Sequence, residues 1–295
     1  MSNVKTKKKP TVRPTYKAGR RAHNRRSGSS TWIIAAVVLA IGVAAVAAVT
    51  SASKGGGADG PASAAVVGKV TSVPVAVVDQ VGPGTAAPAP KPITAPALTA
   101  DGKPRVLYVG AEYCPYCATE RWPMVIALSR FGTFMGLRAT HSSSTDVYPD
   151  TQTFSFHGAR YTSKWISFRG YELETNQRQG DGYVPLDTLS PQDQQIFDTY
   201  DRAPYIGTGA SSNGIPFIDF GGKFLIGGVT YDPSVLQGQS AAAIAGSLSD
   251  PTSAISQGAV GAANAFTAAI CSMTGNQPGR VCADPAIQRI QRALK

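Results

Sequence analysis

The stretch AEYCPYCATERW, residues 111–122, places Cys114 and Cys117 at the spacing Cys-x-x-Cys. This spacing serves dithiol redox chemistry and zinc binding equally well, so the surrounding sequence has to distinguish them. The preceding run RVLYVGA (105–111) is short, apolar and continuous, which predicts a central strand buried on both faces. Apolar residues at helical intervals follow the cysteines, and the stretch therefore predicts a strand, the cysteine pair and a helix containing Pro123.

Turn and capping residues indicate further elements downstream. Two apolar runs at 216–220 and 223–226 are joined by Gly221-Gly222, which predicts a β-hairpin. The stretch 136–142 is a weaker candidate for a second core strand. Helices are predicted from Ser190 with Pro191 at the first position, from Asp232 to about Leu248, and from about Ser253 to Met273.

The order of these elements resembles the thioredoxin fold, in which the active-site motif ends the first core strand and a cis-proline loop precedes a hairpin. The resemblance implies an α/β, thioredoxin-like domain over residues 100–295, with a long insertion at about 142–212 between the second core strand and the cis-proline loop. It also implies that the Ile215–Pro216 bond is cis and packs beside the Cys114 sulfur. The matching positions are Cys114, Pro115, Tyr116, Cys117 and Pro216.

Two stretches carry a closer resemblance. GAEYCPYCATERWPMVIALSRFGTF (110–134) and SSSTDVYP (142–149) are similar to a membrane-anchored, thioredoxin-like actinobacterial family, catalogued as domain-of-unknown-function family 929. The resemblance covers roughly residues 66–295. It implies a fold and a membrane anchor but no activity, so the chemistry rests on the residues themselves.

The two cysteines are expected to have different roles. A free cysteine has a pKa of about 8.5, and the unpaired N–H groups of a helix N-terminus stabilise a thiolate there. Cys114 is therefore expected to be the exposed nucleophile, and Cys117, one turn later, the buried resolving thiol. Pro115 suits the first helical turn, where its missing N–H costs nothing.

Proton transfer to Cys117 is the point at which the sequence departs from thioredoxins. Many thioredoxins carry a buried Asp six residues before the first cysteine, and Tyr108 stands there, neutral at pH 7. Glu112 and Glu120 are nearby acids that could substitute, and solvated charges at a helix end are the alternative. The Pro115-Tyr116 dipeptide also lacks a positive residue, so an intermediate reduction potential is expected.

The other cysteines suggest a structural disulfide rather than a metal site. Zinc takes four ligands, but ten residues lie between Cys271 and Cys282, and no histidine lies close in sequence to either pair. No metal or cofactor is therefore expected. A Cys271–Cys282 bond closing about 12 residues is expected to contribute about 3 kcal/mol to stability.

The N-terminal sequence predicts a membrane anchor. Of the 28 Lys and Arg residues in the 295-residue chain, ten lie in the first 26 residues, which leaves 18 against 18 acidic residues. The remainder is neutral, which argues against nucleic-acid binding. The apolar run from Trp32 to Val49 predicts a signal-anchor helix at 32–50, with a cytoplasmic tail at 1–31 that touches the lipid bilayer. A cleaved signal peptide is the alternative.

Between the anchor and the compact domain, residues 51–99 form a predicted linker rich in Ala, Gly and Pro. Within it, the Val-rich stretch 66–81 is a candidate for a docked strand or extended arm. The compact domain is expected to begin near Ala100.

These features favour a membrane-tethered, extracytoplasmic thiol–disulfide oxidoreductase that acts as an oxidant or isomerase on cysteine-containing exported proteins. A membrane redox partner is implied, because a protein outside the membrane has no access to cytosolic reductant. The alternative is a thioredoxin-like binding or scaffold protein whose cysteine pair is redox-idle.

Overall fold

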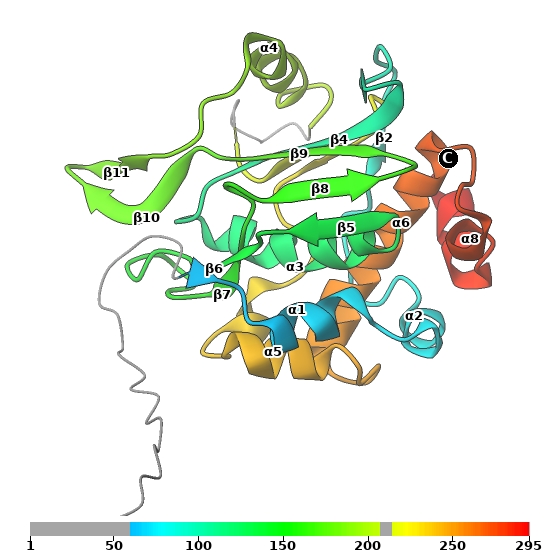
Figure 1. Ribbon diagram of the computed structural model, residues 1–295, viewed down its shortest axis with the longest axis horizontal. Helices are drawn as coiled ribbons and strands as arrows, with labels where there is room; N and C mark the ends of the chain where they lie inside the picture. The colour runs from blue at the N-terminus through cyan, green and yellow to red at the C-terminus, as the bar shows by residue number, and fades with distance from the viewer. Residues whose placement is uncertain (1–59, 207–213, 295) are drawn as a thin grey trace, which may run out of the picture. The chain divides into compact units, whose positions relative to one another are not determined.

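The computed structural model describes residues 60–206 and 214–294. All of them belong to one of the two units into which the chain divides, Ala52–Lys295. The predicted membrane span at 32–50 and the basic tail before it lie outside the described residues. The fold is mixed α/β, with a central sheet that has helices on both faces (Figure 1).

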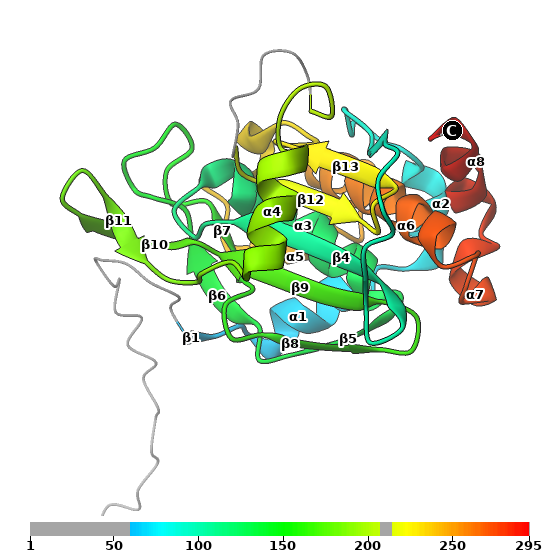
Figure 2. The same ribbon diagram turned by 90° about the horizontal axis from the view of Figure 1, so that it is seen from above.

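The central sheet is organised around β4, Lys103–Gly110, the predicted strand before the cysteines. On one side β4 pairs antiparallel with β12, Phe217–Phe220, which pairs with β13, Phe224–Gly227. On its other side β4 pairs in parallel with β9, Ser167–Glu172 (Figure 2). Two short strands complete the sheet at its edges, β2 (Lys91–Pro92) and β3 (Thr99–Ala100).

Side chains of β4 alternate between two apolar layers. Val106 and Tyr108 enter the larger core on one face, and Leu107 and Val109 enter a smaller cluster on the other. All four are fully buried. Because both faces are covered, the strand is a continuous apolar run rather than an alternating one.

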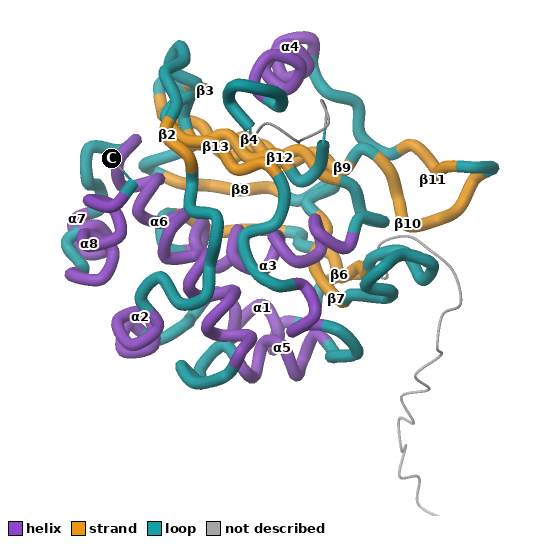
Figure 3. Tube along the Cα trace, turned by 180° about the vertical axis from the view of Figure 1, so that it is seen from behind, coloured by secondary structure: helices purple, strands orange, loops and turns teal. Residues whose placement is uncertain are grey.

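Helices lie on both sides of the sheet (Figures 1 and 3). Above it in Figure 1 lies α4, Pro191–Tyr200, whose Phe197 packs on Phe217 with ring centroids 5.4 Å apart. Below it lies α3, Pro115–Ser129, which packs against α6, Gly261–Met273. The remaining helices are α1 (Ala64–Thr71), α2 (Val75–Val81), α5 (Ala241–Ser247), α7 (Gly279–Cys282) and α8 (Pro285–Ala293).

Smaller sheets surround the central one. The first joins β1, Gly60–Pro61, to β6, Arg138–His141, and β7, Gln152–Ser155. A second pairs β5 (Gly132–Met135) with β8 (Arg160–Ser163). The third is a hairpin of β10 (Glu174–Gln179) and β11 (Gly182–Pro185), which projects from the body of the domain at the left of Figure 1.

The parallel partner of β4 differs from the prediction. The stretch 136–142, expected to supply it, contains β6, which pairs with β1 and β7 instead. The partner is β9, which lies inside the segment predicted as an insertion. Its apolar pattern is weak, because Gly170 lies directly against Phe156 and Glu172 is buried as an ion pair. Long-range contacts therefore determine the position of β9 in the sheet.

The Val-rich stretch at 66–81 also differs from the prediction. It forms α1 and α2 rather than an extended arm, and it belongs to the main core. Valine favours strands when other factors are equal, but here burial against neighbouring helices overrides that preference. The buried residues are Val66, Val70, Val77, Val78 and Val81. No helix among the described residues is by itself long and apolar enough to cross a membrane. Only α1 and α2 taken together reach that length and apolar content, and they are bent by 61° relative to each other.

The local predictions downstream are mostly confirmed. Gly221 and Gly222 form the hairpin turn with φ values of +69° and +70°, and Ser190 caps α4 by accepting a hydrogen bond from the Asp193 N–H. The Cys271–Cys282 disulfide is present and joins α6 to α7. The helix expected from Asp232 is shorter, because only a 3₁₀ turn at Pro233–Leu236 precedes α5. The last predicted helix begins with a π-helical turn at Ser256–Val260 and continues into α6.

Helix α3 runs through Pro123 and ends at Ser129. Proline has no N–H, so the carbonyl of Thr119, four residues earlier, loses its helical donor. The Tyr231 hydroxyl supplies a donor in its place, 3.0 Å from the Thr119 oxygen, in a fully buried position. Tyr231 therefore stabilises the helix that carries the cysteine pair.

Replacing Tyr231 with Phe is expected to lower the free energy of unfolding by about 1–3 kcal/mol, because the Thr119 carbonyl is left buried without a partner. The measurement is urea unfolding followed by circular dichroism. In a Pro123→Ala background the restored N–H at position 123 can bond Thr119, so the cost of Tyr231→Phe should be much smaller. Equal costs in the two backgrounds would show that the hydroxyl does not serve this carbonyl.

Candidate active site

Cys114 is the N-cap residue of α3, and Cys117 lies in its first turn. The Cys114 sulfur accepts a hydrogen bond from the Cys117 backbone N–H, with sulfur and nitrogen 3.2 Å apart. Pro115 occupies the first helical position, as predicted. Both cysteines are free thiols. The helix N-terminus thus directs an otherwise unpaired donor at the Cys114 sulfur, which favours a thiolate.

The two thiols differ in burial less than predicted. The expectation that Cys114 is exposed is wrong, because only 4% of its surface is accessible, while Cys117 is completely buried. The carbonyl oxygen of Ile215 lies 3.9 Å from the Cys114 sulfur and covers it. Cys114 nevertheless remains the more accessible of the two.

The loop that covers Cys114 contains a cis peptide bond between Ile215 and Pro216, as the thioredoxin resemblance implies. The Pro216 carbonyl accepts a hydrogen bond of 2.8 Å from the Gly228 N–H, just after β13. This bond holds the loop against the central sheet. The structure therefore brings Ile215 and its neighbour Pro216 beside Cys114, which lies 101 residues before Ile215 in the sequence.

The surroundings of the cysteines separate their pKa values. Burial alone would raise the pKa of Cys114, but hydrogen bonds from the Cys117 side chain and N–H, together with the positive charge of Arg121, lower it below the ordinary value. Burial raises the pKa of Cys117 well above its ordinary value, and the hydrogen bond to Cys114 and the Cys114 charge raise it further. These opposite shifts make Cys114 the more acidic of the two thiols.

Beneath the pair lies a buried ion pair that the sequence did not reveal. Arg121 Nε and Nη2 donate to the two carboxylate oxygens of Glu172, at 2.8 and 2.5 Å, and Nη2 also donates to the Ala111 carbonyl at 2.6 Å. Both side chains are completely buried. Burial alone would lower the pKa of Arg121, but the Glu172 charge raises it, so Arg121 stays protonated. The Pro115-Tyr116 dipeptide between the cysteines contains no cation, but Arg121 supplies a positive charge from the next turn of the helix.

Tyr108 occupies the position that is acidic in many thioredoxins. It is completely buried, and its hydroxyl has no hydrogen-bond partner among the described residues. Burial raises its pKa well above the ordinary value. The positive charge of Arg121 opposes this effect, and the negative charges of Cys117, Glu172 and Cys114 raise the pKa further. Tyr108 therefore stays neutral and cannot act as a base toward Cys117. Its ring also crosses Gly110, where an added Cβ would collide with the hydroxyl oxygen.

The two nearby acids are buried, so the interpretation of Glu112 and Glu120 as solvated helix-end charges is wrong. Glu120 is completely buried, and its carboxylate accepts hydrogen bonds from the N–H and hydroxyl of Thr230. Its bonds are therefore directed at Thr230. Glu112 is 1% exposed, and among residues 60–206 and 214–294 neither of its carboxylate oxygens has a hydrogen-bond partner.

Aromatic side chains surround the motif from three segments of the chain. Tyr113 stacks on Tyr183 of β11 with ring centroids 4.1 Å apart, and the Arg178 guanidinium lies 4.9 Å from the Tyr183 ring. Tyr116 is 39% exposed and meets Tyr148 edge-on at 6.2 Å. These rings form an aromatic border beside the cysteine motif.

The SSSTDVYP stretch packs against the motif. The Ser143 N–H donates to the Tyr113 carbonyl at 2.7 Å, and the Ser142 hydroxyl, buried beside it, bonds the Tyr148 carbonyl and the Thr151 N–H at 2.9 Å each. The two stretches that carry the family resemblance thus form one surface. Among residues 60–206 and 214–294, no cluster of three or more His, Cys, Asp or Glu side chains is placed to hold a metal ion.

Arg121, Glu172, Tyr148 and Tyr183 are the site residues that sequence reasoning missed. One signal was available, because Arg121 lies four residues after Cys117 and so shares its helical face. Tyr148 lies in the SSSTDVYP stretch that carries the family resemblance. Glu172 and Tyr183 carry no local signal, since only the folding of distant segments brings them to the motif.

Arg121 is expected to accelerate the reaction of Cys114 at neutral pH. The Glu172→Gln variant keeps the Arg121 charge, whereas Arg121→Met/Glu172→Gln removes both charges without leaving either unpaired. The double variant should raise the pKa of Cys114 and slow its alkylation by iodoacetamide at pH 7 severalfold relative to Glu172→Gln. Alkylation rates from pH 5 to 9, followed by mass spectrometry of the Cys114 peptide, measure this.

The matched control is Arg130→Met, because Arg130 is a half-buried arginine at the far end of α3, where it donates to the Thr267 hydroxyl. It should leave the Cys114 profile unchanged. Identical profiles for Glu172→Gln and the double variant would show that Arg121 does not influence the thiolate.

Glu120 predicts a pH-dependent stability. Burial raises its pKa from 4.5 to about 8, against the opposing effect of the Thr230 hydrogen bonds. The folded protein therefore binds a proton that the unfolded chain has lost, so stability is greatest below about pH 4.5 and falls as pH rises to about 8. This group contributes a slope of up to about 1.4 kcal/mol per pH unit.

Urea unfolding of the wild type and Glu120→Gln at pH 5 and pH 8 tests this expectation. The variant should lose less stability between the two pH values, while Glu174→Gln, a half-buried acid of β10, should behave as the wild type. A wild-type slope retained in Glu120→Gln would place the titrating group elsewhere.

Comparisons with known proteins identify a family but no activity. No curated protein and no solved structure matches the chain. The family model described as "Domain of unknown function (DUF929)" matches residues 92–272. That match spans β4, the cysteine pair, the Arg121–Glu172 ion pair and the loop of Pro216. The chain belongs to the domain-of-unknown-function 929 family.

Proposed function

We propose that this protein is a thioredoxin-like thiol–disulfide oxidoreductase, tethered to a membrane, that oxidises or isomerises cysteines of exported proteins. The observation that carries the proposal is the asymmetry of the pair. Cys114 is a helix N-cap whose pKa is lowered, and Cys117 is a buried thiol whose pKa is raised. A low-pKa attacking thiol beside a protonated resolving thiol is what thiol–disulfide exchange requires.

Oxidation of a substrate proceeds in two exchanges. A substrate thiolate attacks Cys114 of the oxidised pair, which forms a mixed disulfide and releases Cys117 as a thiolate that takes up a proton. A second substrate thiolate then attacks the substrate sulfur of that bond and releases the Cys114 thiolate. The substrate loses two electrons, and the Cys114–Cys117 pair gains them.

Isomerisation begins from the reduced pair. The Cys114 thiolate attacks a substrate disulfide and releases one substrate thiolate, which can attack another disulfide of the same chain. If the mixed disulfide persists, Cys117 attacks Cys114 and frees the substrate. The lowered pKa of Cys114 assists both reactions, because it makes Cys114 a ready nucleophile and a good leaving group.

The strand order supports a thioredoxin-like topology. Parallel strands β4 and β9 flank a connection that contains α3, and an antiparallel hairpin of β12 and β13 then pairs with β4. The cysteines follow the end of β4, and the Ile215–Pro216 loop precedes β12. A strand–helix–strand unit followed by a hairpin in this order is the arrangement that the resemblance implies.

Location and partners follow from the N-terminal sequence. The basic tail at 1–31 and the apolar run at 32–50 support an orientation with the domain outside the membrane. A domain in that location meets exported proteins in an oxidising environment. Reoxidation of the reduced pair needs an electron acceptor. A redox partner in the membrane would fill this role.

One observation favours a second candidate function. Because Cys114 is nearly covered, a binding or scaffold protein with an idle cysteine pair also fits the geometry. The aromatic border would then serve partner binding alone. Rapid alkylation of Cys114 by iodoacetamide at neutral pH supports the enzyme, and an inert thiol supports the scaffold.

The roles of the two cysteines lead to a trapping prediction. In Cys117→Ala the mixed disulfide on Cys114 cannot be resolved, so covalent complexes with exported cysteine proteins should accumulate. They should appear as high-mass bands on non-reducing gels and collapse on addition of reductant. Cys114→Ala should trap no partners, because Cys117 is completely buried.

The Cys271→Ala/Cys282→Ala variant serves as the control. It should keep exchange activity while losing about 3 kcal/mol of stability, as expected for a loop of this length. If Cys114→Ala traps as many partners as Cys117→Ala, the proposed roles are wrong. The absence of complexes in every variant would favour the scaffold.

A further inference from the structure

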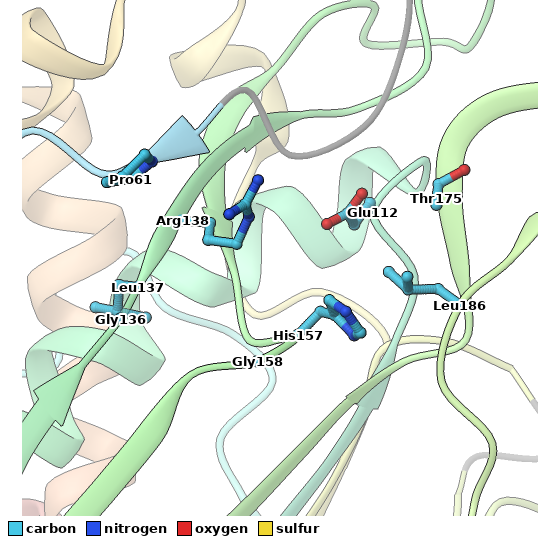
Figure 4. Close-up of a pocket in the computed structure, with 9 residues that line it drawn as sticks. All are labelled: Pro61, Glu112, Gly136, Leu137, Arg138, His157, Gly158, Thr175 and Leu186. Atoms are coloured by element: carbon cyan, nitrogen blue, oxygen red, sulfur yellow. The ribbon is translucent and has the colours of Figure 1, made fainter.

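A second site lies beside the cysteine pair, in a cavity of about 490 Å³ (Figure 4). Neither cysteine lines it. Its apolar wall includes Pro61, Leu137 and Leu186, and its polar groups include Glu112, Arg138, His157 and Thr175. These residues come from β1, β6, β10 and the loops between the sheets, so the folded domain assembles the cavity from distant segments.

Glu112 is the unusual member of this cavity. Its side chain is 1% exposed and lines the cavity, yet neither carboxylate oxygen has a hydrogen-bond partner within the described part of the chain. In Figure 4 the carboxyl group points into the space that Arg138 faces from the other side, with Thr175 and Leu186 beyond it. A buried carboxylate without partners is unfavourable by itself, so the position is expected to be satisfied by a group that enters the cavity.

His157, another polar group of the cavity, is engaged elsewhere. His157 Nδ1 is bonded to Asp187 Oδ1 at 2.7 Å. The Glu112 backbone N–H donates to the Glu174 carbonyl at 2.8 Å, which fixes the main chain and leaves the side chain directed into the cavity. The missing partner of Glu112 is therefore a donor.

Glu112 itself is the reason to expect a cationic donor. It is the acid among the described lining residues, and Arg138 faces it across the cavity. A charged nitrogen also makes a stronger hydrogen bond to a carboxylate than a neutral donor does. A divalent metal would need further oxygen or nitrogen ligands, and no such cluster occurs in the described part of the chain.

We infer that this cavity binds a ligand group consisting of an ammonium on a short aliphatic stem, with the nitrogen at Glu112 and the stem against Leu137, Leu186 and Pro61. A free alkylamine and a lysine side chain of a peptide share this chemistry, and the cavity can hold either. The inference does not depend on redox activity, because neither cysteine takes part in binding.

Calorimetric titration of the full chain tests the inference with three probes. They are n-butylamine, N-acetyl-lysine N-methylamide and the neutral analogue N-acetyl-norleucine N-methylamide. At least one ammonium probe should bind at a single saturable site, with a Kd at least about tenfold lower than that of the neutral analogue. Binding of butylamine identifies a free amine as the ligand, and binding of the lysine derivative alone identifies a peptide side chain.

Glu112→Gln should raise the Kd of the bound probe at least about tenfold. Glu174→Gln, which removes the same charge from a neighbouring residue that does not line the cavity, should leave the Kd unchanged. Without ligand, Glu112→Gln should unfold at a higher temperature than the wild type, because an unpartnered buried charge is gone, and this also shows that the variant is folded.

Three results would overturn the inference: no saturable binding of either amine by the wild type, equal binding of the neutral analogue, or an unchanged Kd in Glu112→Gln. The first two need only the wild-type protein, so they do not depend on the folding of any variant. None of the three bears on the trapping of partners at Cys114, so failure here leaves the proposed oxidoreductase intact.

Discussion

The buried ion pair between Arg121 and Glu172 joins the elements on which the site depends. Arg121 comes from α3 and Glu172 from the end of β9, and the same guanidinium also bonds the Ala111 carbonyl just after β4. Glu172 in turn accepts from the Phe156 N–H, and its own N–H donates to Asp187. Removing one member of such a pair typically costs about 3–5 kcal/mol, because the other charge stays buried alone. The pair therefore fixes the helix, the parallel strand and the loop before Cys114 in a single arrangement.

This arrangement also determines the chemistry of the cysteines. The N-terminus of α3 supplies a donor to Cys114, and Arg121 supplies a full positive charge one turn below Cys117. Each effect stabilises a thiolate, but burial opposes it, and the balance differs between the two sulfurs. Cys114 receives the N–H of Cys117, whereas Cys117 is fully enclosed and feels the negative charge that forms on Cys114. With Tyr108 neutral beside them, the asymmetry comes from the helix terminus, which donates to Cys114, and from the complete burial of Cys117.

The sequence predicts the parts of this fold that local physics determines. Strand β4 has an apolar run, the Gly221-Gly222 turn needs positive φ values, and α4 has Ser190 as its cap. The parallel strand β9 escapes prediction, because Glu172 at its end is a charged residue that is buried by pairing with Arg121, 51 residues earlier in the chain. The Val-rich helices α1 and α2 escape it because burial overrides the preference of valine for strands. In the site, the motif and Pro216 follow from resemblance, but Arg121 looks like an ordinary surface charge until the fold encloses it.

The β10–β11 hairpin contacts both the cysteine site and the cavity of Glu112. Tyr183 of the hairpin stacks on Tyr113 beside Cys114, while Thr175 lines the cavity of Glu112 and the Glu174 carbonyl holds the Glu112 N–H. The hairpin projects from the domain and makes few other contacts with it (Figure 1). A ligand at Glu112 and a substrate at Cys114 therefore meet the same two-stranded element. If binding at one site changes the position of that hairpin, the affinities of the two sites change by the same factor, because coupling between binding sites is reciprocal.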